Sequence, residues 1–287
     1  GRVIPAEPLF RSSYNSNHIH PFITIDEFSN VKNGMESGML NASFLGILRD
    51  LALTGKASFI YAGTYDIKEL PNDPKYGYTG QLAHTLQMPI NAIEDTYADE
   101  LIDAWDKLHF EVDAKSYIRY LSGCVPYWIQ WICLNCGKYA VIHQKHYLGV
   151  HDVDEVVQIM TGEARDEEEI YTWGKIDEIN FQNNQVMTDD GKPAEEALIS
   201  SIAYLNRKNL RRARGISTKE LDSLWEKNNV SKAFQGEMLN AIKRMKVRDT
   251  MIEETEDNRL VYRLAVDLFR RCWYVKHMNI STELSHK

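Results

Sequence analysis

Two short apolar runs near the N-terminus constrain the fold of this chain more than any other feature. The first is Pro21–Ile25 and the second is Ser58–Ala62. Such runs, rich in β-branched or aromatic residues, are typical of strands buried on both faces of a parallel sheet. The residues between them have the apolar spacing of a helix that begins after Asn41 and ends at Gly55. Strand, helix and strand in this order predict a parallel α/β unit with a right-handed crossover.

Each run ends in residues that suit nucleotide chemistry. Asp26 and Glu27 follow the first run, and Gly63 and Thr64 follow the second. Mg²⁺ bound to nucleotide phosphates takes a carboxylate at the C-terminal end of a parallel strand. A second carboxylate beside it can polarise the attacking water, and a hydroxyl at the neighbouring strand end can contact the γ-phosphate. The alternative is a strand that simply ends in a solvated acidic turn.

The middle of the chain is predicted to be helical. Met88–Ile93 is expected to form a third short strand. Apolar residues then recur at helical spacing, which predicts four helices, over residues 97–108, 114–121, 127–141 and 152–160. Residues 163–193 are acidic and then polar, and we expect a linker or a small insertion there.

The C-terminal part has the pattern of three helices followed by a hairpin. The first helix is expected around residues 198–205, the second begins with a capping box at Ser217, and the third begins at Ser231. Two alternating segments then flank a polar turn at Asp257-Asn258. This order predicts a winged helix-turn-helix.

These features resemble the AAA+ superfamily, in its signal-transduction branch, the STAND ATPases, and the related archaeal and bacterial ATPases. Phe22–Glu27 resembles the Walker B strand, and Phe59–Thr64 resembles the sensor strand that follows it. Leu121–Tyr127 resembles the Gly-Gly-x-Pro-Tyr segment of the helical lid, with Cys124 in place of the second glycine. Arg263–Arg271 resembles the strand-to-helix end of the winged helix.

The resemblance implies an α/β fold with three parts. A partial P-loop NTPase parallel sheet is followed by an α-helical lid and a winged helix-turn-helix domain. The implied boundaries are 1–95 for the C-terminal part of the NTPase core, 96–165 for the lid, 166–193 for a linker, 194–276 for the winged helix and 277–287 for a tail.

The resemblance also implies ATP and Mg²⁺ as cofactors of a regulatory switch. Asp26 is expected to hold the metal, with Glu27 supporting hydrolysis. In the family the lid proline packs near the adenine. The residues expected to contact the nucleotide are Thr64, Gly123, Pro126 and Tyr127.

The phosphate-binding loop of this family does not occur in these 287 residues, because no Gly-x-x-x-x-Gly-Lys-Ser/Thr is present. We therefore expect ATPase activity only in a longer protein that carries this loop, and weak or no ATP binding by the present chain. Arg119, before the lid glycine, is either a sensor arginine or part of a solvated helix face.

Two cysteines and two histidines in the middle of the chain raise the question of a zinc site. Cys133 and Cys136, with His143 and His146, have a spacing that zinc can use, but both cysteines lie in an apolar helical run, where cysteine acts as a small hydrophobe. The number of cysteines and the lack of long apolar runs bear on the compartment. Four cysteines are too few for a disulfide scaffold. No secretory signal and no apolar run of about 18 residues occurs, so a cytoplasmic protein without membrane contact is expected.

Charge is distributed unevenly along the chain. Residues 1–193 carry 15 Lys and Arg against 28 Asp and Glu, and residues 194–276 carry 17 against 12. We expect the basic module to dock on the acidic body through a modest, salt-screened contact near Asp166, Glu167 and Glu168, which Trp273 and Tyr274 are candidates to strengthen. The alternative to a regulatory NTPase is a DNA-binding winged-helix protein with a degenerate NTPase core. The basic residues concerned are Arg207, Lys208, Arg211, Arg212, Arg214, Lys243, Arg244, Lys246 and Arg248.

The resemblance to these ATPases also implies binding partners for the protein. We expect a homo-oligomer that acts with an effector domain or a partner protein. DNA is a further candidate partner through the winged helix.

Overall fold

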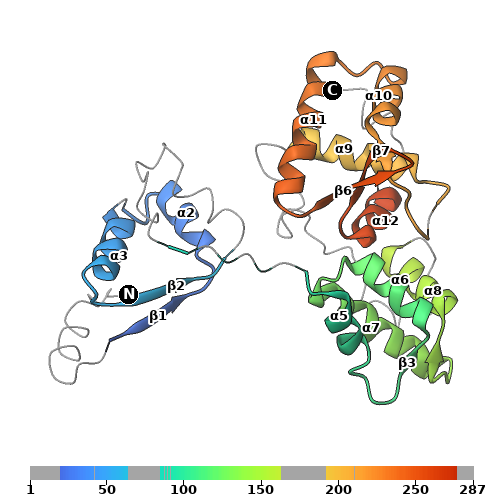
Figure 1. The fold of residues 1–287 in the computed structure, drawn as a ribbon, viewed down its shortest axis with the longest axis horizontal. Coiled ribbons are helices and arrows are strands. Elements are labelled where there is room, and N and C mark those ends of the chain that lie inside the picture. The colour runs from blue at the N-terminus through green and yellow to red at the C-terminus, as the bar shows by residue number, and fades with distance from the viewer. Residues whose placement is uncertain are drawn as a thin grey trace. The chain divides into compact units, whose positions relative to one another are not determined.

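The computed structural model describes residues 20–41, 43–63, 85–86, 88, 90, 92–162, 192–209 and 211–276. They form a mixed α/β structure of helices and small sheets (Figure 1). The chain divides into two compact units, Gly1–Pro89 and Ile90–Lys287, each with its own apolar core. The boundaries expected at 165 and 193 both fall within the second unit.

The first unit contains a parallel pair of strands joined through helices. Its elements are β1 (Phe22–Ile25), α2 (Ser29–Glu36), α3 (Ser43–Leu53) and β2 (Ser58–Tyr61). The register aligns Phe22 with Ser58 and Ile25 with Tyr61. The expected parallel pair is confirmed, although two helices rather than one connect its strands.

The ends of α3 follow from local chemistry. The Ser43 backbone N–H donates to Asn41 Oδ1 at 3.0 Å, so Asn41 satisfies a donor that the first turn leaves free. Beyond the last turn, Gly55 has a φ of 66°, which glycine adopts without steric cost. Both signals could be recognised in the sequence.

The strands of the first unit are not buried on both faces. Phe28, Val31, Leu45 and Leu48 form the core beneath the pair. The side chains facing away from that core are exposed, with Phe22 at 64% and Ile60 at 48%. The expectation of full burial was wrong for the described residues, because the two connecting helices contribute a single small core.

The first half of the second unit is mainly helical. It comprises α5 (Asp95–Ile102), β3 (His109–Phe110), α6 (Val112–Ser122), α7 (Pro126–Ile142), β4 (Tyr147–Leu148) and α8 (Val150–Thr161). Helix α5 ends at Ile102, short of the expected residue 108, because the chain turns so that β3 can pair with β4 in parallel. The described residues of 88–93 form no strand, which corrects the third strand expected there.

The second half of this unit follows a helix, strand, helix, helix, hairpin, helix order. It comprises α9 (Lys192–Leu205), β5 (Ile216–Ser217), α10 (Thr218–Lys227), α11 (Lys232–Val247), β6 (Met251–Glu256), β7 (Arg259–Leu264) and α12 (Asp267–Lys276). The three strands form an antiparallel sheet of order β5-β7-β6.

Local signals in the second half were read correctly from the sequence. The Ser217 N–H donates to Glu220 Oε2 at 3.0 Å in the predicted capping box. Ser231 Oγ accepts from the Phe234 N–H at 3.3 Å at the start of α11. Asp257 and Asn258 have φ values of 48° and 60°, as a tight hairpin turn requires.

One apolar core runs through both halves of the second unit. It contains residues from α5 to α12, including Ile118, Ile129, Ile202 and Leu268, all fully buried. At the junction, the rings of Trp128 and Phe269 meet edge to face with centroids 5.1 Å apart. The halves are therefore joined by core packing rather than by a surface contact alone.

Three further expectations concern Trp273, the acidic docking residues and membrane-spanning helices. Trp273 is only 3% exposed and donates from Nε1 to Ser200 Oγ at 2.8 Å. Asp166, Glu167 and Glu168, named as acidic docking partners, lie outside the described residues, as does the tail. None of the described helices combines the length and apolarity needed to cross a bilayer.

Candidate functional site

The two predicted acidic residues lie directly after β1. The Phe28 N–H donates to Ala62 O at 2.8 Å and the Ala62 N–H donates to Ile25 O at 2.9 Å, so the chains after β1 and β2 stay together beyond the strands. Asp26 and Glu27 are both exposed at this end of the pair. The two carboxylates therefore stand at the C-terminal edge of parallel strands, where ligands of α/β sheets bind.

The backbone at this edge turns sharply. Glu27 has a φ of 52°, which is uncommon for a residue with a Cβ, and its N–H donates to Asp26 Oδ1 at 2.8 Å. Gly63 is exposed just beyond β2, while Thr64 lies outside the described residues. Asp26, Glu27 and the chain after β2 are thus brought together, and the contribution of Thr64 stays a prediction.

This edge suits a metal ion that is already bound to phosphates. Within the described ranges, no group of three or more His, Cys, Asp or Glu side chains could hold a metal ion by itself. Mg²⁺ needs only one or two protein carboxylates when phosphates and waters fill the other positions. Asp26 and Glu27 fit that role, and no closed metal cage is required.

The turn between α6 and α7 holds the predicted lid residues. Gly123 ends α6 with a φ of 58°, and Pro126 is the first residue of α7, as the sequence predicted. A Cβ on Gly123 would lie 2.4 Å from Ala265 O, so no side chain fits there. Tyr127 is 61% exposed on the first turn of α7.

A cleft of about 380 Å³ opens beside this turn. It lies within the second unit, between α6 and the β6–β7 hairpin. Residues that line it include Arg119, Tyr120, Gly123, Cys124, Arg212 and Arg263. Of the predicted nucleotide contacts, Gly123 lines this cleft, whereas Pro126 and Tyr127 do not.

Three arginines of the cleft differ in their partners. Arg119 is ion-paired with Asp95 and Asp99, so it is not simply part of a solvated helix face. Arg263 binds Glu254 at 2.8 Å. Arg212 donates to Ser116 Oγ at 3.3 Å and lies 5.4 Å from the Tyr120 ring centroid.

Arg212 is therefore the arginine of this cleft that has no carboxylate partner among the described residues. A guanidinium held over an aromatic ring and open to a cleft can accept an anionic group. The cleft thus combines a cation and an aromatic ring next to the close approach of Gly123 to Ala265.

The zinc alternative is not supported by the geometry. Cys133 and Cys136 are fully buried in α7, whereas His143 and His146 are exposed beyond its end. Burial raises the pKa of Cys133 to about 12 and that of Cys136 well above its usual value. Both thiols stay protonated, and they pack as small hydrophobes.

We expect native cysteine labelling at pH 8 to be about 100-fold or more slower than in the unfolded chain, because few thiolates form. Cys124, the half-buried one, should react first, although burial and a hydrogen bond to Asp95 raise its pKa to about 11. Timed labelling with a thiol reagent, compared with Cys124→Ala, measures this. Rapid reaction of Cys133 or Cys136 would show that α7 is not packed as described.

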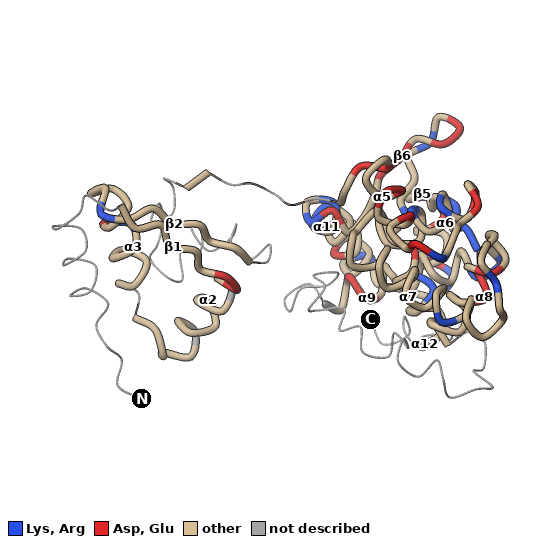
Figure 2. Tube along the Cα trace, turned by 90° about the horizontal axis from the view of Figure 1, so that it is seen from below, with Lys and Arg blue, Asp and Glu red and all other residues tan. Residues whose placement is uncertain are grey.

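Figure 2 shows the Lys and Arg positions in blue along the trace, and most of the basic residues named above form ion pairs within the chain. Buried Glu195 binds both Arg244 and Arg248, at 3.3 and 2.9 Å. The other ion pairs are Arg211 with Asp154, Arg214 with Glu220, and Lys246 with Glu253. Binding of DNA phosphates would have to compete with these contacts, so DNA binding stays a prediction without geometric support.

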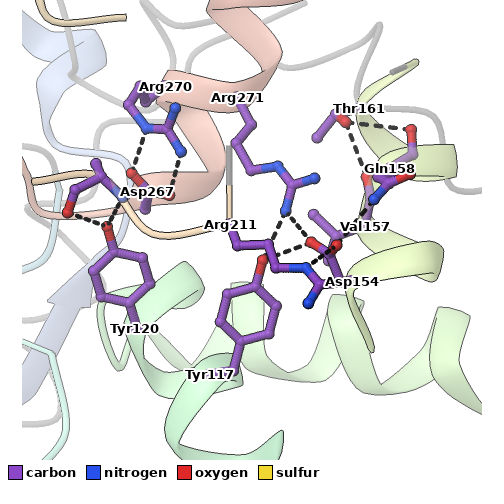
Figure 3. A network of polar contacts seen from close by, with 11 residues as sticks. Tyr117, Tyr120, Asp154, Val157, Gln158, Thr161, Arg211, Asp267, Arg270 and Arg271 are labelled. Carbon is purple, nitrogen blue, oxygen red and sulfur yellow. Dashed lines mark hydrogen bonds and ion pairs between the residues drawn. The ribbon is translucent and has the colours of Figure 1, made fainter. Parts of the chain in front are cut away.

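A buried polar network that the sequence did not reveal joins the two halves (Figure 3). Asp154 on α8 is 1% exposed and accepts hydrogen bonds at both carboxylate oxygens. Its donors are Tyr117, Gln158, Arg211 and Arg271, at 2.7–2.9 Å. The available signal was Arg270-Arg271 within the apolar stretch of α12, since charged residues in such a stretch need buried partners.

No family model, curated protein or solved structure matches this chain.

Proposed function

We propose that this chain is part of an ATP-binding regulatory NTPase of the AAA+ signal-transduction type. The observation that carries the proposal is the edge of the β1–β2 pair, where Asp26 and Glu27 stand exposed beside the chain that leaves β2. Carboxylates at the C-terminal end of parallel strands suit a magnesium–nucleotide complex. Asp26 holds Mg²⁺, Glu27 polarises the attacking water and Thr64 contacts the γ-phosphate.

Three features of the second unit support the same proposal. The α6–α7 turn has a left-handed Gly123 and a helix-starting Pro126, which suits the lid segment that contacts the adenine together with Tyr127. The cleft beside Gly123 offers Arg212 to an anionic group. The order of α9, β5, α10, α11 and the β6–β7 hairpin suits a winged helix-turn-helix, which we propose reports the nucleotide state.

In this proposal the protein acts as a nucleotide-controlled switch in the cytoplasm. Slow ATP hydrolysis resets it, and its partners are further copies of itself and an effector domain or protein. Internal ion pairs favour this function over DNA reading, because they engage five of the nine basic residues that DNA phosphates would need, namely Arg211, Arg214, Arg244, Lys246 and Arg248.

Calorimetric titration with ATP tests the proposal. A longer protein that carries a phosphate-binding loop should bind ATP in the presence of Mg²⁺, and Asp26→Ala should remove the magnesium-dependent part of the affinity. Asp50→Asn, at an exposed acid of the same unit, is the matched control and should bind like the wild type.

The present chain should bind ATP weakly or not at all, because a Walker B carboxylate reaches phosphates only through Mg²⁺. Micromolar ATP affinity for residues 1–287 would contradict this expectation. Magnesium-independent binding that Asp26→Ala does not alter would overturn the role of Asp26.

A further inference from the structure

The Asp154 network, which consists of Tyr117, Asp154, Arg211 and Arg271, joins four separate segments, namely α6, α8, the chain before β5 and α12. Oδ1 of Asp154 accepts from Tyr117 Oη and from Arg271 Nη1, each at 2.8 Å, and Oδ2 accepts from Arg211 Nε at 2.7 Å (Figure 3). Arg211 and Arg271 belong to the second half of the unit, and Tyr117 and Asp154 to the first. The carboxylate is thus shared across the junction.

The two central charges of this network are buried, whereas the Arg211 side chain is 56% exposed. Asp154 and Arg271 are 1% and 0% exposed. Burial disfavours the charged carboxylate, but the hydrogen bonds from Tyr117, Arg211 and Arg271 outweigh that effect, so the pKa of Asp154 lies below its ordinary value. Separating the halves would leave a buried charge on each side without its partner.

Two more contacts connect the halves along the same face of α6. Tyr120 Oη accepts from the Ala213 N–H at 2.8 Å and donates to Ala213 O at 3.2 Å. At the end of α6, Gly123 lies against the backbone of Ala265. Because Tyr117, Tyr120 and the C-terminal Gly123 are spaced three residues apart, their contacts to the second half lie on one face of α6.

We propose that helices α5–α8 and α9–α12 behave as one rigid lever with no hinge between them. The continuous core and the Asp154 network oppose any separation, and a close-packed interior transmits displacement. A movement imposed on the α6–α7 turn therefore reaches α12 directly, through Gly123 and Ala265. For its regulatory meaning this inference rests on the proposed function, since the same turn is the proposed lid contact.

The lever differs from a module that docks and releases. Release would need a contact that a ligand can break, such as exposed ion pairs screened by salt. The junction described here is apolar and its central ion pair is buried. The two halves consequently move together when the nucleotide state changes, and the winged-helix half is not set free from the lid half.

Amide hydrogen exchange of the chain 1–287 without nucleotide tests the lever. Asp154→Asn should accelerate exchange of the slowest amides in α7 and in α11 by the same factor, about 10²–10⁴-fold, because both helices open in one cooperative event. Asp103→Asn is the control, since Asp103 forms a half-exposed pair with Lys115. It should leave both helices at wild-type rates.

The inference is overturned if Asp154→Asn accelerates exchange in α9–α12 while α7 keeps its wild-type rates, because the halves would then separate. If Asp154→Asn does not fold, Tyr117→Phe replaces it; this variant removes the hydrogen bond that Tyr117 donates to Asp154 and the one it accepts from Arg271, and it must still affect α7 and α11 equally. Since no nucleotide is present, failure of the lever leaves the proposed ATP site untouched. Loss of Asp26-dependent ATP binding would conversely leave the lever intact.

Discussion

Asp154→Asn is expected to lower the free energy of unfolding of the second unit by about 3–5 kcal/mol, the range found when one partner of a buried ion pair is removed. The substitution keeps the shape of the side chain but removes the Asp154 carboxylate from buried Arg271. It also removes the partner of Arg211. Urea denaturation followed by tryptophan fluorescence measures the loss.

The matched control is Asp103→Asn. Asp103 and Lys115 are 50% and 21% exposed, and their ion pair lies on the surface of the same unit. Such pairs contribute about 0–1 kcal/mol. Equal losses for the two variants would mean that the burial of Asp154 has no special energetic role.

The effect of Asp154→Asn should also depend on pH. The pKa of Asp154 is lower in the folded protein than in the unfolded chain, where it is about 3.9. The charged carboxylate therefore stabilises the fold above that value, and this stabilisation is lost as the pH falls through the folded pKa. The difference between wild type and variant should shrink below about pH 4. A difference that is constant down to the lowest measurable pH would contradict this.

Glu27→Gln is expected to slow ATP turnover by about 10²–10⁴-fold in a protein that carries the phosphate-binding loop, the usual contribution of a general base. Glu27 is exposed and glutamine matches its size, so folding and nucleotide binding should be preserved. Single-turnover phosphate release measures the chemical step, and calorimetry measures binding.

Asp50→Asn serves as the control for this experiment as well, because it removes an exposed carboxylate from the same unit. It should hydrolyse ATP at the wild-type rate. Hydrolysis by Glu27→Gln at that same rate would remove Glu27 from the proposed mechanism, and loss of ATP binding would assign it to the metal instead of the water.

The candidate site divides into a part that the sequence indicated and a part that it did not. Asp26 and Glu27 follow an apolar run whose parallel partner could be identified, so their place at one strand edge was predictable. Gly123 was indicated by its motif, but its close approach to Ala265 depends on packing with the C-terminal half. Arg212 became a candidate for binding an anionic group only because the structure places it in the cleft.

What the sequence alone determined are features with a local cause. Pro126 begins α7, Ser217 and Ser231 begin α10 and α11, and Asp257-Asn258 forms the hairpin turn. Each depends on hydrogen bonds or backbone angles within a few residues, so a short stretch of sequence is sufficient to specify it.

Only the tertiary structure decided the features that depend on distant residues. Helix α5 ends early because β3 pairs with β4, and one face of the β1–β2 pair is exposed because its core is small. The Asp154 network unites Tyr117 with Arg271, 154 positions apart in the chain. Burial and charge pairing of this kind arise from which surfaces meet in three dimensions, and no local pattern in the sequence encodes that choice.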